Sequence, residues 1–165
     1  MPSIFKKILL VFFVITIYFF GIRELRKSIH DFYMGTILPA EYGEINENIS
    51  FYAQSSVSFT LVDLKAENHK GWQFKIPFGS FYLFAVIGLL FLQSDKKTYA
   101  LLSGFHLLMG VTTVILVVIG IKFSTALLIV VDFISRYLLP LGSFGYVAFL
   151  YGKLKMNDRL YANQT

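Results

Sequence analysis

The chain contains no cysteine. Disulfide bonds, metal sites built from thiolates and a cysteine nucleophile are therefore excluded. The sequence also lacks the motifs of several common enzyme classes, because it contains no Walker loop, dinucleotide fingerprint, HExxH or GxSxG pattern. We accordingly predict no catalytic residues, no metal site and no cofactor.

Charged residues are almost missing from four long segments of the chain. With 56% hydrophobic residues and a mean hydropathy of +0.64, the protein is too apolar for an ordinary soluble domain. A hydrocarbon core about 30 Å thick requires a helix of about 20 apolar residues, and each segment comes near this length. We predict an all-α membrane protein with four transmembrane helices, at residues 8–22, 76–92, 99–121 and 123–151.

Basic residues flank the predicted spans and determine the expected orientation. If the chain crosses the membrane four times, one side receives Lys6, Lys7, Lys96, Lys97, Lys153, Lys155 and Arg159. The positive-inside rule places that side in the cytoplasm, so residues 1–22 form a cytoplasmic N-terminus with the first span and residues 152–165 a cytoplasmic tail. No small-x-small cleavage site follows the first span, which indicates an uncleaved anchor in the plasma membrane. We interpret the net charge of +5 as these topology anchors and not as a nucleic-acid-binding surface.

Residues 23–75 form the one sizeable extramembrane segment, which this orientation places outside the cytoplasm. Leu25, Ile29 and Phe32 recur at helical spacing, so the first helix is expected to continue into this segment. Further along, two runs alternate apolar and polar residues with period two, which is typical of a β-hairpin. The remaining three spans, at residues 76–151, follow directly.

One register of this hairpin pairs Phe59 with Phe74 and Leu61 with Trp72, which places all four side chains on one face. A two-stranded hairpin is marginally stable in water, so this face must pack on something. The candidates are the outer helix ends, a further strand from residues 49–54, or another protein. We therefore predict an extracytoplasmic interaction face made by these four residues.

Asp132 and Arg136 interrupt the last apolar segment, four residues apart and so on one helical face. A charge inside the bilayer costs about 2.5–3.5 kcal/mol, so both are expected to pair or to face protein or water. Pro140 follows one turn later and frees a backbone carbonyl. This group is interpreted either as a buried polar site, including a lock to a partner's helix, or as a self-neutralised pair. His106, in the third span and toward the opposite leaflet from Asp132, is expected to be a hydrogen-bonding strut or, alternatively, a proton relay.

The last span also carries a stripe of small residues, made by Gly142, Gly145, Ala148 and Gly152. Small side chains allow a second helix to approach closely, and packing drives helix association in lipid. The stripe predicts a helix-packing face for either a neighbour within the chain or a foreign subunit.

The layout of the chain resembles that of the small membrane proteins encoded with exosortases. The segment Gly-Trp-Gln-Phe-Lys-Ile-Pro-Phe-Gly at residues 71–79, which runs from a strand directly into the second span, carries the local resemblance. The resemblance implies an accessory of a protein-sorting or envelope-export system in a bacterial inner membrane. It transfers no functional residue, and the cysteine nucleophile of exosortases has no counterpart here.

Two functions remain open at this point. The first is a non-enzymatic accessory subunit, embedded in the lipid bilayer, that binds a membrane-protein partner or a second copy of itself. The second is a small membrane enzyme or transporter that uses Asp132 and Arg136. The small number of polar residues in the spans favours the accessory subunit, because a catalytic site usually requires several polar side chains that converge.

Overall fold

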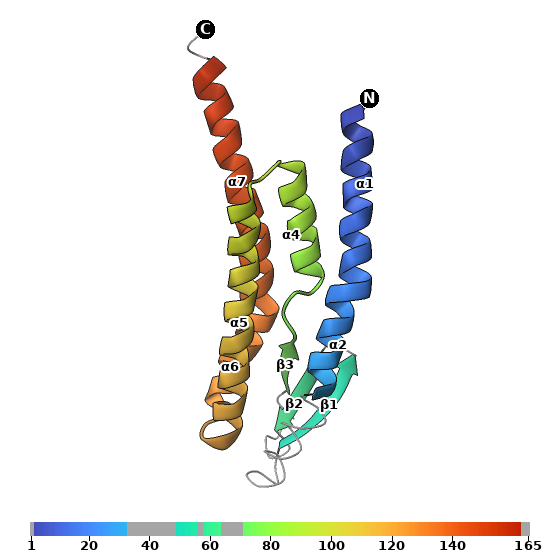
Figure 1. The fold of residues 1–165 in the computed structure, drawn as a ribbon. Helices are drawn as coiled ribbons and strands as arrows, with labels where there is room; N and C mark the ends of the chain where they lie inside the picture. Colours follow the sequence, from blue (N-terminus) through green and yellow to red (C-terminus); the bar gives the residue numbers. More distant parts are fainter. Residues whose placement is uncertain (1, 33–48, 56–57, 64–70, 163–165) are drawn as a thin grey trace.

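The computed structural model describes residues 2–32, 49–55, 58–63 and 71–162. This part of the chain is mostly helical and contains one small antiparallel sheet (Figure 1). The elements follow one another as α1 (Pro2–Ile17), η1 (Tyr18–Ile22), α2 (Arg23–Phe32), β1 (Ile49–Ser55), β2 (Ser58–Asp63), β3 (Gly71–Lys75), α4 (Ser80–Phe91), α5 (Lys96–Lys122), α6 (Ala126–Phe133), η3 (Ile134–Leu138) and α7 (Leu139–Ala162).

Among the described residues, three helices are long and apolar enough to cross a membrane: Ile4–Phe32, Lys96–Lys122 and Ala126–Met156. The first joins α1, η1 and α2, so the helix does continue beyond residue 22 as its spacing predicted. These apolar helices are compatible with membrane insertion. The described part of the chain is thus mostly helical, and its long apolar helices agree with the membrane insertion that the missing charges predicted.

The predicted span at residues 76–92 is only partly helical, because α4 begins at Ser80. Its 12 residues extend about 18 Å, which is less than the thickness of a hydrocarbon core. Pro77 has no backbone N–H, and Phe78 has a φ of 60°, in the left-handed region that a helix does not allow. Residues 76–79 therefore form a non-helical connector between β3 and α4, and the described residues do not contain four helical spans of full length.

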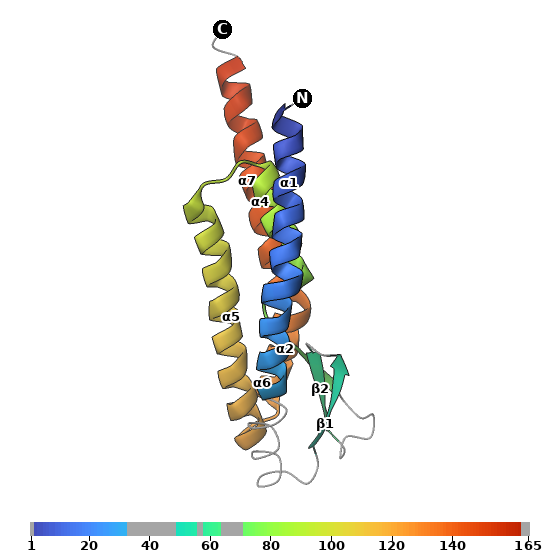
Figure 2. The ribbon, with the colours of Figure 1, turned by 45° about the vertical axis from the view of Figure 1, so that its right-hand side comes forward.

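The sheet has three strands in the order β1-β2-β3, so the segment at residues 49–54 does supply a further strand. The pairing of β2 with β3 matches the predicted register, because Phe59 lies opposite Phe74 and Leu61 opposite Trp72. Turning the molecule shows the sheet beside the lower parts of α2 and α6 (Figure 2).

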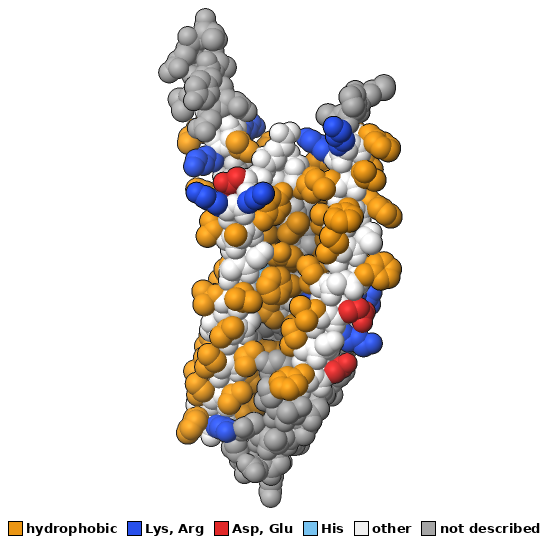
Figure 3. Space-filling view, viewed as in Figure 1, with side chains coloured by type: hydrophobic (Ala, Val, Ile, Leu, Met, Phe, Trp, Pro, Cys, Tyr) orange, Lys and Arg blue, Asp and Glu red, His pale blue; other side chains and the backbone are white. Residues whose placement is uncertain are grey.

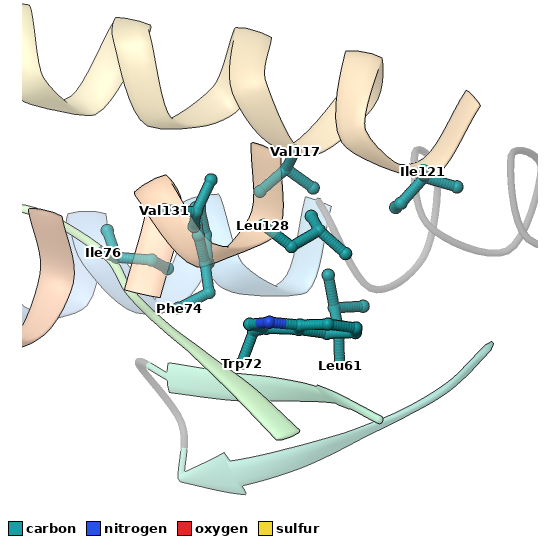
Figure 4. Close-up of a cluster of buried hydrophobic side chains, with 8 residues drawn as sticks. All are labelled: Leu61, Trp72, Phe74, Ile76, Val117, Ile121, Leu128 and Val131. Atoms are coloured by element: carbon teal, nitrogen blue, oxygen red, sulfur yellow. The ribbon is translucent and has the colours of Figure 1, made fainter. Parts of the chain in front are cut away.

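The buried face of the sheet packs against the lower ends of α5 and α6. Eight side chains form this core, four from β2, β3 and the residue after β3 and four from the two helices: Leu61, Trp72, Phe74, Ile76, Val117, Ile121, Leu128 and Val131 (Figure 4). Because the strands cannot bury their apolar face by themselves, this packing is what stabilises the sheet.

Two π-helical segments interrupt the long helices. The segment η3 ends two residues before Pro140, whose nitrogen cannot donate the hydrogen bond that a regular α-helix requires. Such a wide turn accommodates the missing donor, which explains its place in the sequence.

Both termini and the connection between α4 and α5 lie at one end of the molecule, and the sheet lies at the other (Figure 1). Basic side chains gather at the end that carries the termini, while apolar side chains cover much of the surface between the ends (Figure 3). The long helix Ile4–Phe32 is the least packed, with 6% of its most apolar window buried.

Candidate functional site

Asp132 joins the last helix to the sheet. Its Oδ1 atom accepts the backbone N–H of Gln73 at 2.7 Å and also lies 2.7 Å from Nε of Arg136. One turn along, the Ser135 hydroxyl accepts the backbone N–H of Lys75 at 3.3 Å. Alternate residues of a strand direct their N–H groups to the same edge, so these two helix side chains bind the edge of β3 that β2 does not pair. We call this the edge junction.

The structure thus brings Asp132 and Arg136 together as an ion pair, with a side-chain exposure of 22% for the acid and 45% for the base. The pair is neutral as a unit, and its acid already accepts a backbone donor. An acid in this arrangement positions a strand, because its charge and its hydrogen bonds serve contacts within the chain.

His106 is fully buried, with 1% exposure, and is not part of this pair. Its Nδ1 atom accepts the backbone N–H of Phe78 at 3.3 Å, so the neutral ring carries its proton on Nε2. Nε2 lies 2.9 Å from the Ser143 hydroxyl, which donates to the carbonyl of Leu139 at 2.7 Å. His106 therefore links α5 to α7 and to the connector, where it holds the left-handed Phe78 in place. This geometry agrees with a structural, hydrogen-bonding role for His106.

Arg26, on α2, holds the connector from the opposite side. Its Nη2 and Nε atoms donate to the carbonyl of Ile76 at 2.8 and 3.3 Å, and Nη1 donates to the Tyr18 hydroxyl at 3.4 Å. Arg26 is 8% exposed. Among the residues that the structure describes, no carboxylate pairs with this guanidinium. We call these contacts of Arg26 and His106 with residues 76–79 the connector junction.

A cavity of about 570 Å³ opens beside the connector junction, and we call it the Arg26 cavity. Three cationic side chains line it, from Arg23, Arg26 and Lys75, and its described lining contains no acidic residue. The hydroxyls of Tyr18, Ser80 and Ser135 and the ring of His106 also contribute to the lining.

No sequence motif marks Arg26, because it lies among other basic residues in the cluster after the first span. The pattern that could have indicated its burial is the helical spacing, since Tyr18, Ile22, Arg26 and His30 follow one another at intervals of four residues and so share one face of the helix. Three of these four are buried on the inner side of the first helix.

The predicted interaction face lies inside the protein. Leu61, Trp72 and Phe74 have exposures of 1%, 9% and 2% and contact the chain's own helices. The side chain of Phe59 lies outside the described part of the chain. The surface was expected to be covered, and the helix ends of the same molecule cover it.

The small-residue stripe divides into two parts. A Cβ atom at Gly142 would overlap the ring of Phe105 on α5, so this glycine permits a close approach within the chain. Cβ atoms at Gly145 and Gly152 would meet nothing within 4 Å. Ala148 is likewise exposed, so these three residues form an open strip on α7.

The described residues contain no group of three histidine or acidic side chains that could hold a metal ion. Comparison with protein families, curated proteins and solved structures finds no match to this chain. Asp132, Arg136 and His106 bind backbone groups or side chains of the same chain. The buried charge that has no acidic partner among the described residues is the positive charge of Arg26. His106 and Ser143 lie within hydrogen-bond distance of each other, but both are fully buried and both also bind backbone groups, so this pair serves contacts within the chain.

Proposed function

We propose that this protein is a non-enzymatic integral membrane subunit that crosses the membrane four times and binds another membrane protein. The observation that carries the proposal is the use of its intramembrane polar residues. Asp132 pairs with Arg136 and binds the edge of the sheet, and His106 binds the connector. The enzyme or transporter alternative requires these same groups to be available to a substrate.

The fourth crossing consists of α4 together with the connector. The helix extends about 18 Å, and the connector lengthens this crossing toward the hydrocarbon core of about 30 Å. Irregular backbone is tolerated at membrane depth where protein surrounds it and satisfies its polar groups. The carbonyl of Ile76 and the N–H of Phe78 receive such partners from Arg26 and His106.

An even number of crossings agrees with the position of both termini at one end of the molecule (Figure 1). The basic residues near that end favour a cytoplasmic position for it under the positive-inside rule. The sheet then lies on the outer face of the inner membrane. Such an orientation suits an accessory of a protein-sorting or envelope-export system, in keeping with the resemblance to exosortase-associated proteins.

The partner surface that we propose is the open strip Gly145, Ala148 and Gly152 on α7. Small residues that face lipid allow the backbone of a second helix to approach closely. The weakly packed helix Ile4–Phe32 adds a second apolar surface in the same molecule. A membrane subunit with two such surfaces has room for a partner helix without rearrangement of its own core.

Cysteine cross-linking in native membranes tests this proposal, because the chain has no cysteine of its own. We expect Ala148→Cys to give one specific cross-linked species, with a different protein or with a second copy. Leu107→Cys serves as the matched control, since Leu107 is 63% exposed on α5 and lines a pocket with residues of α2 and none of α7. Equal cross-linking at both positions, or none at Ala148→Cys, would contradict the proposed surface.

The enzyme alternative has its own test in the double variant Asp132→Asn with Arg136→Gln. Both side chains keep hydrogen-bonding atoms but lose their charges. A subunit should retain partner binding, whereas proton or ligand chemistry at this pair should be abolished. Loss of partner binding in a folded double variant would instead favour a direct role for the pair.

A further inference from the structure

The Arg26 cavity combines a buried positive charge with empty space beside it. Arginine keeps its proton in proteins, so burial cannot neutralise Arg26. A buried cation is normally paired, because the loss of hydration is costly without an opposite charge. Within the described part of the chain Arg26 has only neutral partners, the Ile76 carbonyl and the Tyr18 hydroxyl.

Two further cations share the cavity with Arg26. Arg23 lies one turn before Arg26 on the same helix, and Lys75 reaches the cavity from the end of β3. No acidic side chain offsets these charges among the described lining residues. Three positive charges around one space of about 570 Å³ repel one another until an anion enters.

The start of α4 adds donors to the same space. Gly79 is the N-cap of this helix and provides no side-chain cap, so the first backbone N–H groups of α4 have no partner within the helix. A Cβ atom built on Gly79 would lie 3.3 Å from Nη2 of Arg26, which places the guanidinium directly at the helix N-terminus. Gly79, Ser80 and Phe81 all line the cavity. A helix N-terminus beside an arginine is a favourable arrangement for phosphate oxygens.

We propose that the Arg26 cavity binds a phosphate group, of the kind that the headgroup of an anionic lipid carries. The remaining walls of the cavity are apolar and come from Phe19, Phe81, Leu83, Phe84 and Leu139. An amphiphile places its phosphate on the cations and its hydrocarbon on these walls. This binding site is separate from the partner surface on α7 and does not depend on it.

The test uses the purified full chain in lipid nanodiscs, with the single tryptophan, Trp72, as the reporter of unfolding. Discs of phosphatidylcholine alone are compared with discs that also contain phosphatidic acid or phosphatidylglycerol. Inorganic phosphate is titrated separately into the phosphatidylcholine discs. A ligand that binds only the folded protein raises its Tm, so we expect a higher Tm in the anionic discs.

Three variants assign any such increase to the cavity. Arg26→Gln keeps a donor for the Ile76 carbonyl but removes the charge, and we expect the affinity for anionic lipid to fall by about tenfold or more. Arg23→Gln should give a smaller loss, since Arg23 is exposed and its charge lies farther out. Lys27→Gln is the matched control, because Lys27 is exposed on the same helix, carries the same charge and does not line the cavity.

Each outcome decides the proposal. A Tm increase that Arg26→Gln abolishes and Lys27→Gln retains supports it. If Arg26→Gln does not fold, the contrast between Arg23→Gln and Lys27→Gln takes its place. An increase with inorganic phosphate alone identifies a free phosphate as sufficient, while an increase only in anionic discs identifies the lipid. No increase with any probe, or equal increases in all variants, would overturn the proposal.

Discussion

The edge junction and the connector junction are built alike and differ in charge. In each, a charged side chain of a long helix binds the backbone of the segment that runs from β3 into α4. Asp132 accepts an N–H at the edge junction, and Arg136 compensates its charge. Arg26 donates to a carbonyl at the connector junction without an acidic partner in the described chain. The edge junction, whose charge is compensated, only stabilises the fold. The connector junction, whose positive charge has no acidic partner in the described chain, can also attract an anion.

The largest expected effect follows from breaking the compensated junction. Asp132→Ala leaves the N–H of Gln73 without its acceptor and Arg136 without its counter-charge. We expect a loss of about 2 kcal/mol in the free energy of unfolding, because the strand loses a hydrogen bond to a charged acceptor while the half-exposed Arg136 is hydrated. Denaturant unfolding in mild detergent, followed by Trp72 fluorescence, measures this loss. Asp31→Ala is the control, since its carboxylate is exposed, and an equal loss there would contradict the role of the junction.

Removal of Arg26 should have a smaller effect on stability than removal of Asp132. Arg26→Met leaves the Ile76 carbonyl without its donors, but it also removes a buried charge that has no counter-ion. The two changes oppose each other, so we expect a net loss of about 1 kcal/mol in discs of neutral lipid. The same fluorescence measurement applies. A loss as large as that of Asp132→Ala would mean that the two junctions are equally compensated.

Ser135→Ala sharpens the comparison within the edge junction itself. The substitution removes the acceptor of the Lys75 N–H but changes no charge. We expect a loss of about 1 kcal/mol, the usual contribution of one neutral hydrogen bond. Ser28→Ala is a suitable reference, because the Ser28 hydroxyl bonds only to its own exposed helix. Hydrogen exchange at the edge of β3 should rise in Ser135→Ala and remain unchanged in the reference.

The smallest effect concerns a carboxylate outside both junctions. Asp95 caps the start of α5 and accepts hydrogen bonds from the hydroxyl and the N–H of Thr98, which lowers the pKa of its carboxyl below the usual value. A lowered folded-state pKa stabilises the folded protein above the unfolded pKa, and this contribution disappears as the pH falls through the folded value. The Tm of Asp95→Asn should therefore differ slightly from that of the native chain at neutral pH and converge with it in acid. A difference that grows in acid would contradict this assignment.

Local patterns in the sequence predicted much of the fold. The uncharged segments marked the long helices, and the period-two alternation gave the register that pairs Phe59 with Phe74. Spacing also placed Asp132 and Arg136 on one helical face, where they form their ion pair. These features depend on residues near one another in the chain or on a periodicity within one element, so no knowledge of the tertiary structure was required.

Other features needed contacts between distant residues. Hydropathy alone marked residues 76–92 as one span, but Pro77 and the left-handed Phe78 delay the helix until Ser80. The partners that make this irregular backbone tolerable are Arg26 and His106, which lie 50 and 28 residues away from the groups that they bind. A pattern within one segment contains no information about such partners.

The sequence by itself determined that this protein has long apolar helices compatible with membrane insertion, because an uncharged segment of about 20 residues matches the hydrocarbon of a bilayer in length and polarity. It also determined the pairing of β2 with β3. Only the tertiary structure decided that the sheet packs on its own helices, that Asp132 binds a strand, and that Arg26 is buried with no acidic partner among the described residues. The physical reason is that burial and charge compensation depend on which segments meet in space.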